Sequence, residues 1–371
     1  MDDRELLRAT LRLTLADGVG ALTFGRLVQA FGDASAVPAN RPHALRQVEG
    51  VGEKTAHAIG AVSDDDVNQE LDLAEKLRAR IVCMNDEDYP SGLKNIHDPP
   101  PVLYVMGQLL KTDALAVGVV GARHCSHYGM EQAERFGQLL ARAGFTVISG
   151  GARGIDTAGH RGALSAGGRT VAVMGCGLVK TYPPENQKFF EQIVADGRGA
   201  VISELPLRTA VLPGNFPTRN RIISGLSLGV LIVEAARRSG SLITARVAAE
   251  QGRTVFAVPG RVDSPTSQGA NELIRNGAIL VQDLDDVLEH LGDVGDKMTP
   301  SEAELAPPLP GIADGPERTL LDALAGGPMN LDELVRSTGL DSGKVLSTMT
   351  MLVLKGAVAQ QPGNVFARKS R

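Results

Sequence analysis

Short apolar runs alternate with amphipathic segments through residues 80–290, and this alternation constrains the fold more than any other feature of the chain. Seven runs have the length of a buried strand: Leu115–Val120, Phe145–Ser149, Thr170–Met174, Ala200–Ser203, Gly229–Glu234, Thr254–Val258 and Ala278–Val281. The segments between them include five helix candidates: Gly129–Ala143, Asp156–Ala166, Pro184–Ala195, Leu242–Gln251 and Gly269–Asn276. Periodicity alone does not separate buried strands from buried helices, but the lengths and flanking glycines favour strands. We therefore predict an α/β fold built on an extended, Rossmann-like parallel sheet.

A chain of 371 residues exceeds one ordinary core, and the segment before the sheet differs from it in pattern. Residues 1–75 form a predicted helical module of the helix-hairpin-helix or SAM-like type. In this module Gly18-Val19-Gly20 and Gly50-Val51-Gly52 each precede an apolar-periodic helix. Such turns either present backbone N–H groups to a phosphate or only allow the chain to turn tightly. Both interpretations stay open from the sequence.

The C-terminal segment, residues 316–371, has the pattern of a winged helix and follows an acidic, proline-containing linker at 291–315. Its predicted parts are helices Glu317–Ala325, Leu331–Thr338 and Ser342–Lys355 and a two-stranded wing around Pro362-Gly363-Asn364. Asp341 is placed to cap the third helix, which would be the recognition helix. That helix has an apolar body, whereas a duplex reader usually brings Arg, Asn or Gln to base edges. We expect protein contact or degenerate binding from it.

The net charge of −5 hides an uneven distribution. Eight acidic side chains and one lysine lie between Asp283 and Glu304, a local net of −7. Between Arg80 and Gln282, 21 basic side chains stand against 16 acidic ones, a net of +5. The central module is therefore mildly basic, which permits a polyanionic partner without requiring one.

Membrane and secreted classes are excluded by simple features. No apolar stretch reaches the roughly 18 residues of a membrane span. The start, MDDRELLRAT, is charged and helix-like and lacks the apolar region of an export signal. Three cysteines in so long a chain form no disulfide framework and fit a reducing cytoplasm, which is the location we expect.

Two glycine-containing loops follow neighbouring predicted strands and lead into helices. The first is Gly121-Ala122-Arg123, and the second contains Ser149, Gly150, Gly151 and Arg153. Amides at a helix N-terminus attract an anion, and a guanidinium group fits phosphate oxygens, so the two loops together predict a pair of phosphate cradles. Either loop taken alone is explained as well by an ordinary helix start, and Asp156 is placed to cap the second helix. The spacing does not continue as G-x-G-x-x-G with an acid at the end of the next strand, which argues against a dinucleotide. We predict no cofactor.

The densest polar cluster lies at residues 215–221 and contains Phe216, Arg219, Asn220 and Arg221. Arginines neutralise phosphate and an aromatic ring stacks on a base. A surface helix cap with incidental charges would explain either arginine, but not the ring in a chain with nine Phe, four Tyr and no Trp. A further strand-to-helix loop carries Ser239 and Ser241. We predict that both segments contact nucleic acid.

Neither a catalytic nor a metal site is predicted. His124, Cys125 and His127 are close in sequence, but no carboxylate or second cysteine completes a zinc-like spacing. His160 is expected to be a packed or capping histidine. The serines at 239 and 241 have no evident His/Asp partners for nucleophilic catalysis.

The chain closely resembles bacterial DprA, the DNA-processing protein A (Smf) family, in an ordered series of segments: GAR, SHYG, SGGARGIDTAGHRGAL, AVMGCGLVKTYPPEN, SELP, NFPTRNRIISGLS, VEAARRSGSLITARVAAEQGR and VFAVPG. The resemblance runs continuously from about residue 80 to 282, and this order of segments is highly specific. The two flanking modules are similar to that family's flanking domains, with less specific motifs.

The resemblance implies a homodimeric protein that binds single-stranded DNA, protects incoming DNA and delivers RecA onto it in natural transformation, without enzymatic activity. A single-stranded DNA-binding protein is a further candidate partner. The motifs imply DNA contacts at Gly121, Arg123, Arg153, Phe216, Arg219, Asn220 and Arg221, and at Lys180, which lies near a position where the family often has a basic residue. Two residues depart from the family pattern. Ala122 replaces the usual serine, and Val179 replaces the aspartate common before the Tyr-Pro pair.

Two other functions compete with this one. A nucleotide enzyme of the phosphoribohydrolase type would share the fold, but its PGG-x-GT-x-x-E run is reduced here to Val258-Pro259-Gly260-Arg261, without a counterpart of the catalytic Glu. A duplex-binding regulator would place the main activity in the winged helix. Release of a free base would support the first, and loss of all DNA binding on truncation before Pro316 would support the second.

Overall fold

The structure is a computed structural model, and it describes residues 3–39, 41–291, 316–324, 329–342, 344, 345, 348, 349, 352, 358–361 and 365–368. The chain divides into two compact units, residues 1–294 and residues 295–371. The predicted linker at 291–315 apart from its first residue, much of the predicted helix Ser342–Lys355 and the tip of the predicted wing lie outside the described residues. The predicted domain boundaries therefore stay predictions.

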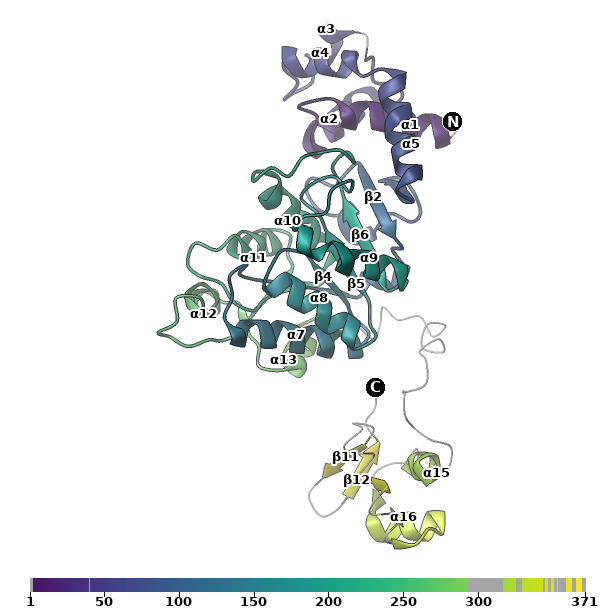
Figure 1. Cartoon of the computed structure of the whole chain (residues 1–371), viewed down its shortest axis with the longest axis vertical. Coiled ribbons are helices and arrows are strands. Elements are labelled where there is room, and N and C mark those ends of the chain that lie inside the picture. Colours follow the sequence, from purple (N-terminus) through teal and green to yellow (C-terminus); the bar gives the residue numbers. More distant parts are fainter. Residues whose placement is uncertain are drawn as a thin grey trace. The chain divides into compact units, whose positions relative to one another are not determined.

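A nine-stranded sheet organises the first unit (Figure 1). Its strands are β1 (Ala79–Cys83), β2 (Val102–Gly107), β3 (Ala116–Val120), β4 (Thr146–Ser149), β5 (Thr170–Val173), β6 (Gly199–Ser203), β7 (Gly229–Ile232), β8 (Thr254–Ala257) and β9 (Ile279–Leu280). They lie in the order β1-β2-β6-β5-β4-β3-β7-β8-β9. The seven neighbouring strands β6-β5-β4-β3-β7-β8-β9 are all parallel to one another. At the other end of the sheet, β2 pairs antiparallel with both β1 and β6.

The predicted parallel sheet is confirmed: six of the seven predicted runs contain a strand, and the run Ala200–Ser203 covers all of β6 except its first residue, Gly199. The two antiparallel strands were missed. The apolar run VLYVMG of β2 was visible in the sequence, but it is not followed by a crossover helix of its own. The chain leaves β3 toward β4 in one direction and later returns to pair β7 on its other side, so the strand order reverses beside β3. Ligands bind at such a reversal in open α/β sheets.

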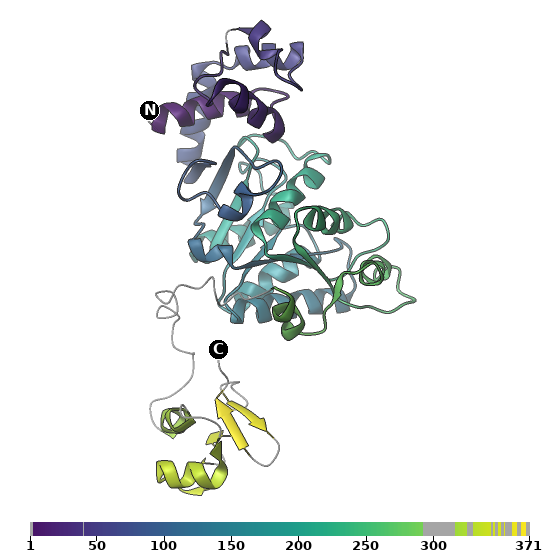
Figure 2. The ribbon, with the colours of Figure 1, turned by 180° about the vertical axis from the view of Figure 1, so that it is seen from behind.

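Helices cover both faces of the sheet (Figures 1 and 2). They are α6 (Ser91–Lys94), α7 (His127–Arg142), α8 (Ile155–Ser165), α9 (Gln187–Ala195), α10 (Asn215–Leu226), α11 (Ser241–Glu250), α12 (Gln268–Arg275) and α13 (Leu284–His290), with short 3-10 turns at Lys111–Ala114 and Pro184–Asn186. Alternate strand residues face opposite layers. Val117 and Val119 pack in the core that contains α7 and α8, whereas Val120 and Val230 pack with Ile223 of α10.

The N-terminal helices pack on the antiparallel end of this sheet. They are α1 (Asp3–Leu15), α2 (Ala21–Phe31), α3 (Pro42–Leu45), α4 (Glu53–Ala61) and α5 (Asp64–Lys76). Leu11 of α1 and Val67 of α5 share a core with Tyr104 of β2. The buried Glu70 of α5 accepts a hydrogen bond from the Leu207 amide at 2.7 Å. The helical module and the sheet are therefore joined by both apolar and polar contacts.

The two predicted Gly-x-Gly turns each begin a helix. Gly20 precedes α2 and Gly52 precedes α4. The first glycine of each turn has a positive φ, +87° at Gly18 and +84° at Gly50, which favours glycine over other residues. A Cβ at Gly18 would lie 2.8 Å from the Thr55 hydroxyl, and one at Gly50 would lie 2.8 Å from Arg26 Nη1. Backbone conformation and close packing explain these glycines without a ligand.

The second unit contains α15 (Pro316–Ala323), β10 (Met329–Asn330), α16 (Leu331–Thr338), β11 (Val358–Gln361) and β12 (Val365–Arg368). Its three strands lie in the order β10-β12-β11, and its core contains Leu320, Leu334, Val345 and Phe366. Asn330 caps α16 by accepting from the Glu333 amide at 2.9 Å. Helices followed by a small antiparallel sheet agree with the predicted winged helix.

Within these described ranges, no helix is both long and apolar enough to cross a bilayer.

Candidate functional site

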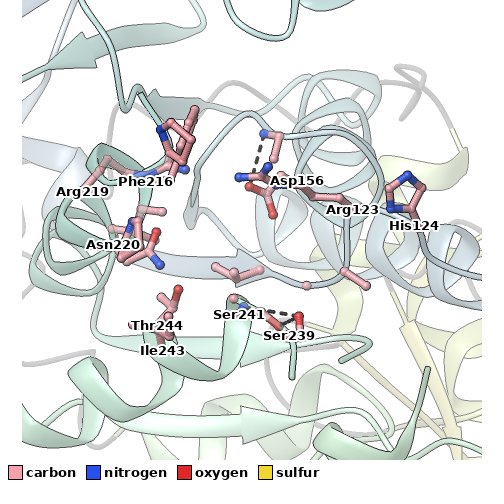
Figure 3. A pocket seen from close by; sticks show the side chains of 18 of the residues that line it. Arg123, His124, Asp156, Phe216, Arg219, Asn220, Ser239, Ser241, Ile243 and Thr244 are labelled. Carbon is pink, nitrogen blue, oxygen red and sulfur yellow. Dashed lines mark hydrogen bonds between the residues drawn. The ribbon is translucent and has the colours of Figure 1, made fainter. Parts of the chain in front are cut away.

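A cavity of about 670 Å³ opens beside β3, where the strand order reverses (Figure 3). Its walls come from the segment Val120–His124 after β3, from Ala152 and Asp156 after β4, and from the segment between β7 and α11. The first turns of α10 and α11 form the remaining sides. The cavity thus combines residues that are far apart in sequence and meet only because parallel strands end at the same edge.

The cavity is positively charged and has one aromatic wall. Three guanidinium groups, those of Arg123, Arg219 and Arg238, and one carboxylate, that of Asp156, line it, which gives a net charge of +2. The guanidinium of Arg123 lies over the ring of Phe216, 5.0 Å from its centroid. This geometry is that of a cation–π pair, and it leaves a flat, positively charged surface at the cavity.

Arg219 reaches the cavity from inside the protein. Only 4% of it is exposed, and its Nη1 donates to the Val173 carbonyl. Its guanidinium lies directly over Gly150, where a Cβ would overlap with it. Burial lowers the pKa of Arg219 to about 10, although nearby Asp156 raises it. The group remains charged at neutral pH, and Gly150 provides the space that it occupies.

Phe216 depends on a second glycine. A Cβ at Gly175, which follows β5, would lie 2.9 Å from the Phe216 ring. The ring also packs against Tyr182, with centroids 5.5 Å apart. Two glycines after neighbouring strands, at 150 and 175, therefore make room for side chains of α10.

Asp156 occupies the N-terminus of α8, where we predicted a phosphate. Its carboxylate accepts from the Ala152 amide at 3.3 Å, and a hydrogen bond from the Gly121 amide also favours its charged form. Burial raises the pKa of Asp156 despite these contacts and the charges of Arg219 and Arg123. The protein's own carboxylate thus takes the Ala152 and Gly121 amides, which leaves fewer free amides for the phosphate cradle predicted after β4.

Glu234 fills the N-terminus of α7 in the same way. It is 2% exposed and accepts from the Ser126 amide at 2.7 Å, the Ser126 hydroxyl at 2.9 Å and the Thr266 hydroxyl at 2.6 Å. The Ala122 amide, which belongs to the predicted first cradle, donates to the Glu234 carbonyl at 2.7 Å. The Ala122 and Ser126 amides thus serve the fold, and of the cradle predicted after β3 the Arg123 side chain remains at the cavity.

The helices on the other side of the cavity lack such carboxylates. Gly214 and Gly240 precede α10 and α11 without a side-chain cap, and neither first turn contains an acidic residue. Ser239 and Ser241 share a hydrogen bond of 2.7 Å between their hydroxyls. The Thr244 hydroxyl is buried and has no partner among the described residues. These two positive helix ends and their hydroxyl groups face the cavity.

Of the predicted contact residues, the cavity brings together Gly121, Arg123, Phe216, Arg219, Asn220, Ser239 and Ser241. Gly150 lies behind Arg219, and Gly151, with a φ of +63°, lies against Phe190. The buried Ser149 donates to the Val119 carbonyl at 2.6 Å. Arg153 and Lys180 are exposed outside the cavity lining, and Arg153 pairs with Glu185 through a 3.0 Å hydrogen bond.

Arg221 has a different role from the one we predicted. It is 6% exposed, and its guanidinium donates to Asp98 at 2.7 Å and to Glu204 at 2.9 and 2.6 Å. Residues two apart on a helix point in different directions, so α10 turns Arg219 toward the cavity and Arg221 away from it. All of its nitrogens are engaged in these ion pairs, and we remove Arg221 from the contact residues.

Arg238 and Thr244 line the cavity but were missed by sequence reasoning. Arg238 is adjacent to the predicted Ser239, and Thr244 lies three residues after Ser241 on α11. A helical wheel drawn from Ser241 would have found Thr244. The prediction of a packed His160 is confirmed, since it is fully buried. Across the described residues, no cluster of His, Cys, Asp and Glu side chains could hold a metal ion.

Comparison with known proteins agrees with this architecture. Residues 80–292 match the family DNA recombination-mediator protein A, and residues 301–364 match the DprA winged helix domain. Protein Smf of Synechocystis is 36% identical over 95% of this chain and 96% of its own length.

Two solved structures are similar as well. The X-ray structure of DNA processing protein A from Streptococcus pneumoniae superposes with a TM-score of 0.65 at 32% identity, covering 77% of this chain and 96% of that one. A structure that describes the single-stranded DNA binding mode of DNA processing protein A from Helicobacter pylori has a TM-score of 0.51 at 28% identity, covering 58% of this chain and 97% of that one. The matched family covers more than half of the chain, and the Synechocystis relative nearly all of it. The chain therefore belongs to the DNA recombination-mediator protein A (DprA) family.

Proposed function

We propose that this protein binds single-stranded DNA in the cavity beside β3. The observation that carries the proposal is the wall formed by Arg123 and Phe216, next to two helix ends that have no carboxylate of their own. An unpaired strand offers both phosphates and free base faces, which suit guanidinium groups and an aromatic ring. The Helicobacter pylori relative, described by its single-stranded DNA binding mode, supports this choice of ligand.

The contacts divide by chemistry. Arg123 and Arg238 are exposed and suit phosphates that pass the cavity mouth. Phe216 and Asn220 are half-buried and suit a base, since a ring stacks on any base and an amide both donates and accepts. A paired base has its hydrogen-bonding edge occupied and its faces stacked. The cavity therefore favours an unpaired strand over a duplex.

We further propose that the bound strand is incoming DNA in natural transformation or recombination, and that the protein protects it and loads RecA onto it. On this proposal the protein works in the cytoplasm as a homodimer and without catalysis, and a single-stranded DNA-binding protein is a further partner. Membership of the DprA family supports this role. No residues are assigned to the contacts with RecA or with the second protomer.

Fluorescence anisotropy with a labelled oligonucleotide tests the DNA site. Removing one phosphate contact weakens binding and reduces the log–log salt slope by about 0.7. We expect this of Arg123→Ala and Arg219→Ala, with melting curves to confirm that both variants fold. Arg246→Ala is the matched control, because Arg246 is exposed on α11 and outside the cavity lining. Parent-like affinity in both cavity variants would refute the site.

The nucleotide-enzyme alternative is tested separately. Incubation with nucleoside monophosphates and chromatography of the products would detect a released base. We expect none, because the PGG-x-GT-x-x-E run of such enzymes is reduced here to Val258-Pro259-Gly260-Arg261, without a counterpart of the catalytic Glu. Release of a base at a rate that depends on Asp156 would favour the enzyme over the binding protein.

A further inference from the structure

Two buried nitrogen atoms behind the cavity have no hydrogen-bond partner among the described residues: Nε2 of His160 and Nε of Arg219. His160 is fully buried, and Arg219 is 4% exposed. A buried polar atom without a partner loses the free energy of its hydration, so such atoms are rare in proteins. Nε of an arginine can only donate. What Nε2 of His160 can do depends on the tautomer of the imidazole.

The neighbours of His160 determine this tautomer. Nδ1 of His160 lies 2.6 Å from the Thr170 hydroxyl, and that hydroxyl lies 2.7 Å from the Val147 carbonyl. A carbonyl only accepts, so the single hydroxyl proton of Thr170 goes to Val147. The Thr170 oxygen must then accept from Nδ1–H. A neutral imidazole with its proton on Nδ1 has a lone pair on Nε2, so Nε2 is an acceptor.

The two unpartnered atoms are therefore complementary, and they belong to one cluster. Asp156 and His160 are four residues apart on α8 and lie on one face of that helix. Both interact electrostatically with Arg219. On the sheet side, Thr170 contacts His160 and Val173 accepts from Arg219, and both belong to β5. Burial, with the charge of Arg219, lowers the pKa of His160 to about 3, so the ring stays neutral at physiological pH.

We propose that His160 is a positioning residue, whose neutral imidazole accepts at Nε2 from one water molecule that in turn accepts from Nε of Arg219. The proposal rests on the proposed function for its use of Arg219 in DNA binding. A guanidinium group is planar, so contacts at Nε and Nη1 together orient the plane. The Val173 carbonyl holds Nη1, and His160 holds Nε through this water. Arg219 lines the cavity, so the N–H groups that Val173 and His160 do not engage are the ones left for a ligand there.

NMR of the protein without DNA tests the contact itself. Long-range nitrogen–proton spectra of the parent should show His160 protonated on Nδ1 and unprotonated on Nε2 at pH 7. The Nε–Hε signal of Arg219, assigned by its loss in Arg219→Lys, should exchange slowly with solvent. His160→Leu should speed this exchange at least about tenfold, and His160→Gln, which retains an acceptor, should largely restore it.

DNA titrations of the same variants test whether the contact between His160 and Arg219 contributes to DNA binding. We expect His160→Leu to weaken binding as much as Arg219→Ala does, and the double variant to bind no more weakly than Arg219→Ala. His160→Gln should remain within about threefold of the parent. A merely structural histidine would change stability without this rescue and without this lack of additivity.

Three results would overturn the proposal: an imidazole protonated on Nε2 in the parent, an unchanged Arg219 signal in a folded His160→Leu, or additive losses in the double variant. The parent spectrum decides the tautomer even when the leucine variant does not fold. If the Arg219 signal changes while DNA affinity does not, the contact stands and the DNA role of Arg219 fails. The two proposals can therefore fail separately.

Discussion

The cavity beside β3 lies between two pairs of helix ends that look alike in sequence and differ in chemistry. Each of α7, α8, α10 and α11 begins near a glycine or serine at the same edge of the sheet. Glu234 and Asp156 occupy the ends of α7 and α8. The ends of α10 and α11 contain no acidic residue and line the cavity.

The difference teaches that a helix end is an anion site only when the protein leaves it free. The dipole and the first-turn amides attract any carboxylate as readily as a phosphate. Glu234 comes from the end of β7, more than a hundred residues after the amides that it caps. The sequence around the start of α7 therefore does not show that the Glu234 carboxylate lies there. Comparing the two pairs suggests two kinds of experiment: removing the carboxylate from a helix end that has one, and adding a carboxylate to a helix end that has none.

Emptying the α7 end should have the largest effect. Glu234→Ala removes the acceptor of three hydrogen bonds, which leaves the Ser126 amide and the hydroxyl protons of Ser126 and Thr266 without that acceptor in a part-buried place. We expect a loss of about 3 kcal/mol in the free energy of unfolding, measured by urea denaturation. Glu250→Ala is the control, since Glu250 is exposed and should cost less than about 0.5 kcal/mol. Equal losses in both would show that Glu234 is no cap.

Filling the α11 end should weaken DNA binding about tenfold, or about 1.4 kcal/mol. Ser239→Asp places a carboxylate beside the first turn of α11, where it would repel phosphate as Asp156 does at α8. The same change should leave stability equal or slightly higher, because an acid is favourable at a helix N-terminus. Gln268→Asp adds the same charge at the start of α12, outside the cavity lining, and controls for net charge. Unchanged affinity in Ser239→Asp would exclude this end from the site.

Lowering the pH should reduce the free energy of unfolding through His160, by a smaller amount than the two substitutions above change stability or binding. Burial lowers the pKa of His160 from 6.5 to about 3 in the folded protein, so the unfolded chain binds the extra proton between these values. Its stabilising contribution is complete above pH 6.5 and declines as the pH falls toward 3. Between pH 7 and 5.5 this amounts to about 1 kcal/mol. Denaturation curves of the parent and His160→Gln should converge by that amount, and parallel curves would contradict the pKa shift.

Charges outside the cavity should matter least. Arg153 pairs with the exposed Glu185, and Lys180 is exposed beyond the lining. We expect each alanine variant to weaken DNA binding only about twofold, through long-range attraction that salt screens. The same anisotropy titration measures this, with Arg123→Ala for comparison. A loss equal to that of Arg123→Ala would mean that the strand runs over these residues too.

Sequence patterns predicted the sheet well because strand burial and helix spacing are local properties. Each of the seven apolar runs coincides with a strand to within a few residues, and the order of the motifs in the sequence is that of the DprA family. The site was predicted in part. Arg123, Phe216, Arg219 and Asn220 meet at one cavity, whereas Arg221 turns into ion pairs with Asp98 and Glu204. The helical turn of α10 separates these arginines, and the sequence interpretation had treated residues 215–221 as one cluster.

By itself, the sequence determined the class of fold, the winged-helix pattern of the second unit and the residue types that can contact a nucleic acid. Only the tertiary structure decided which helix ends are free. Glu234 reaches the start of α7 from 108 residues away, which is known only once β7 lies beside β3, whereas Asp156 belongs to the first turn of α8 itself. The tertiary structure also explains Gly150 and Gly175, because the absence of a side chain at these positions leaves space for Arg219 and Phe216. Hydrophobic patterning is encoded over a few neighbouring residues, whereas a site depends on contacts between residues that the fold brings together.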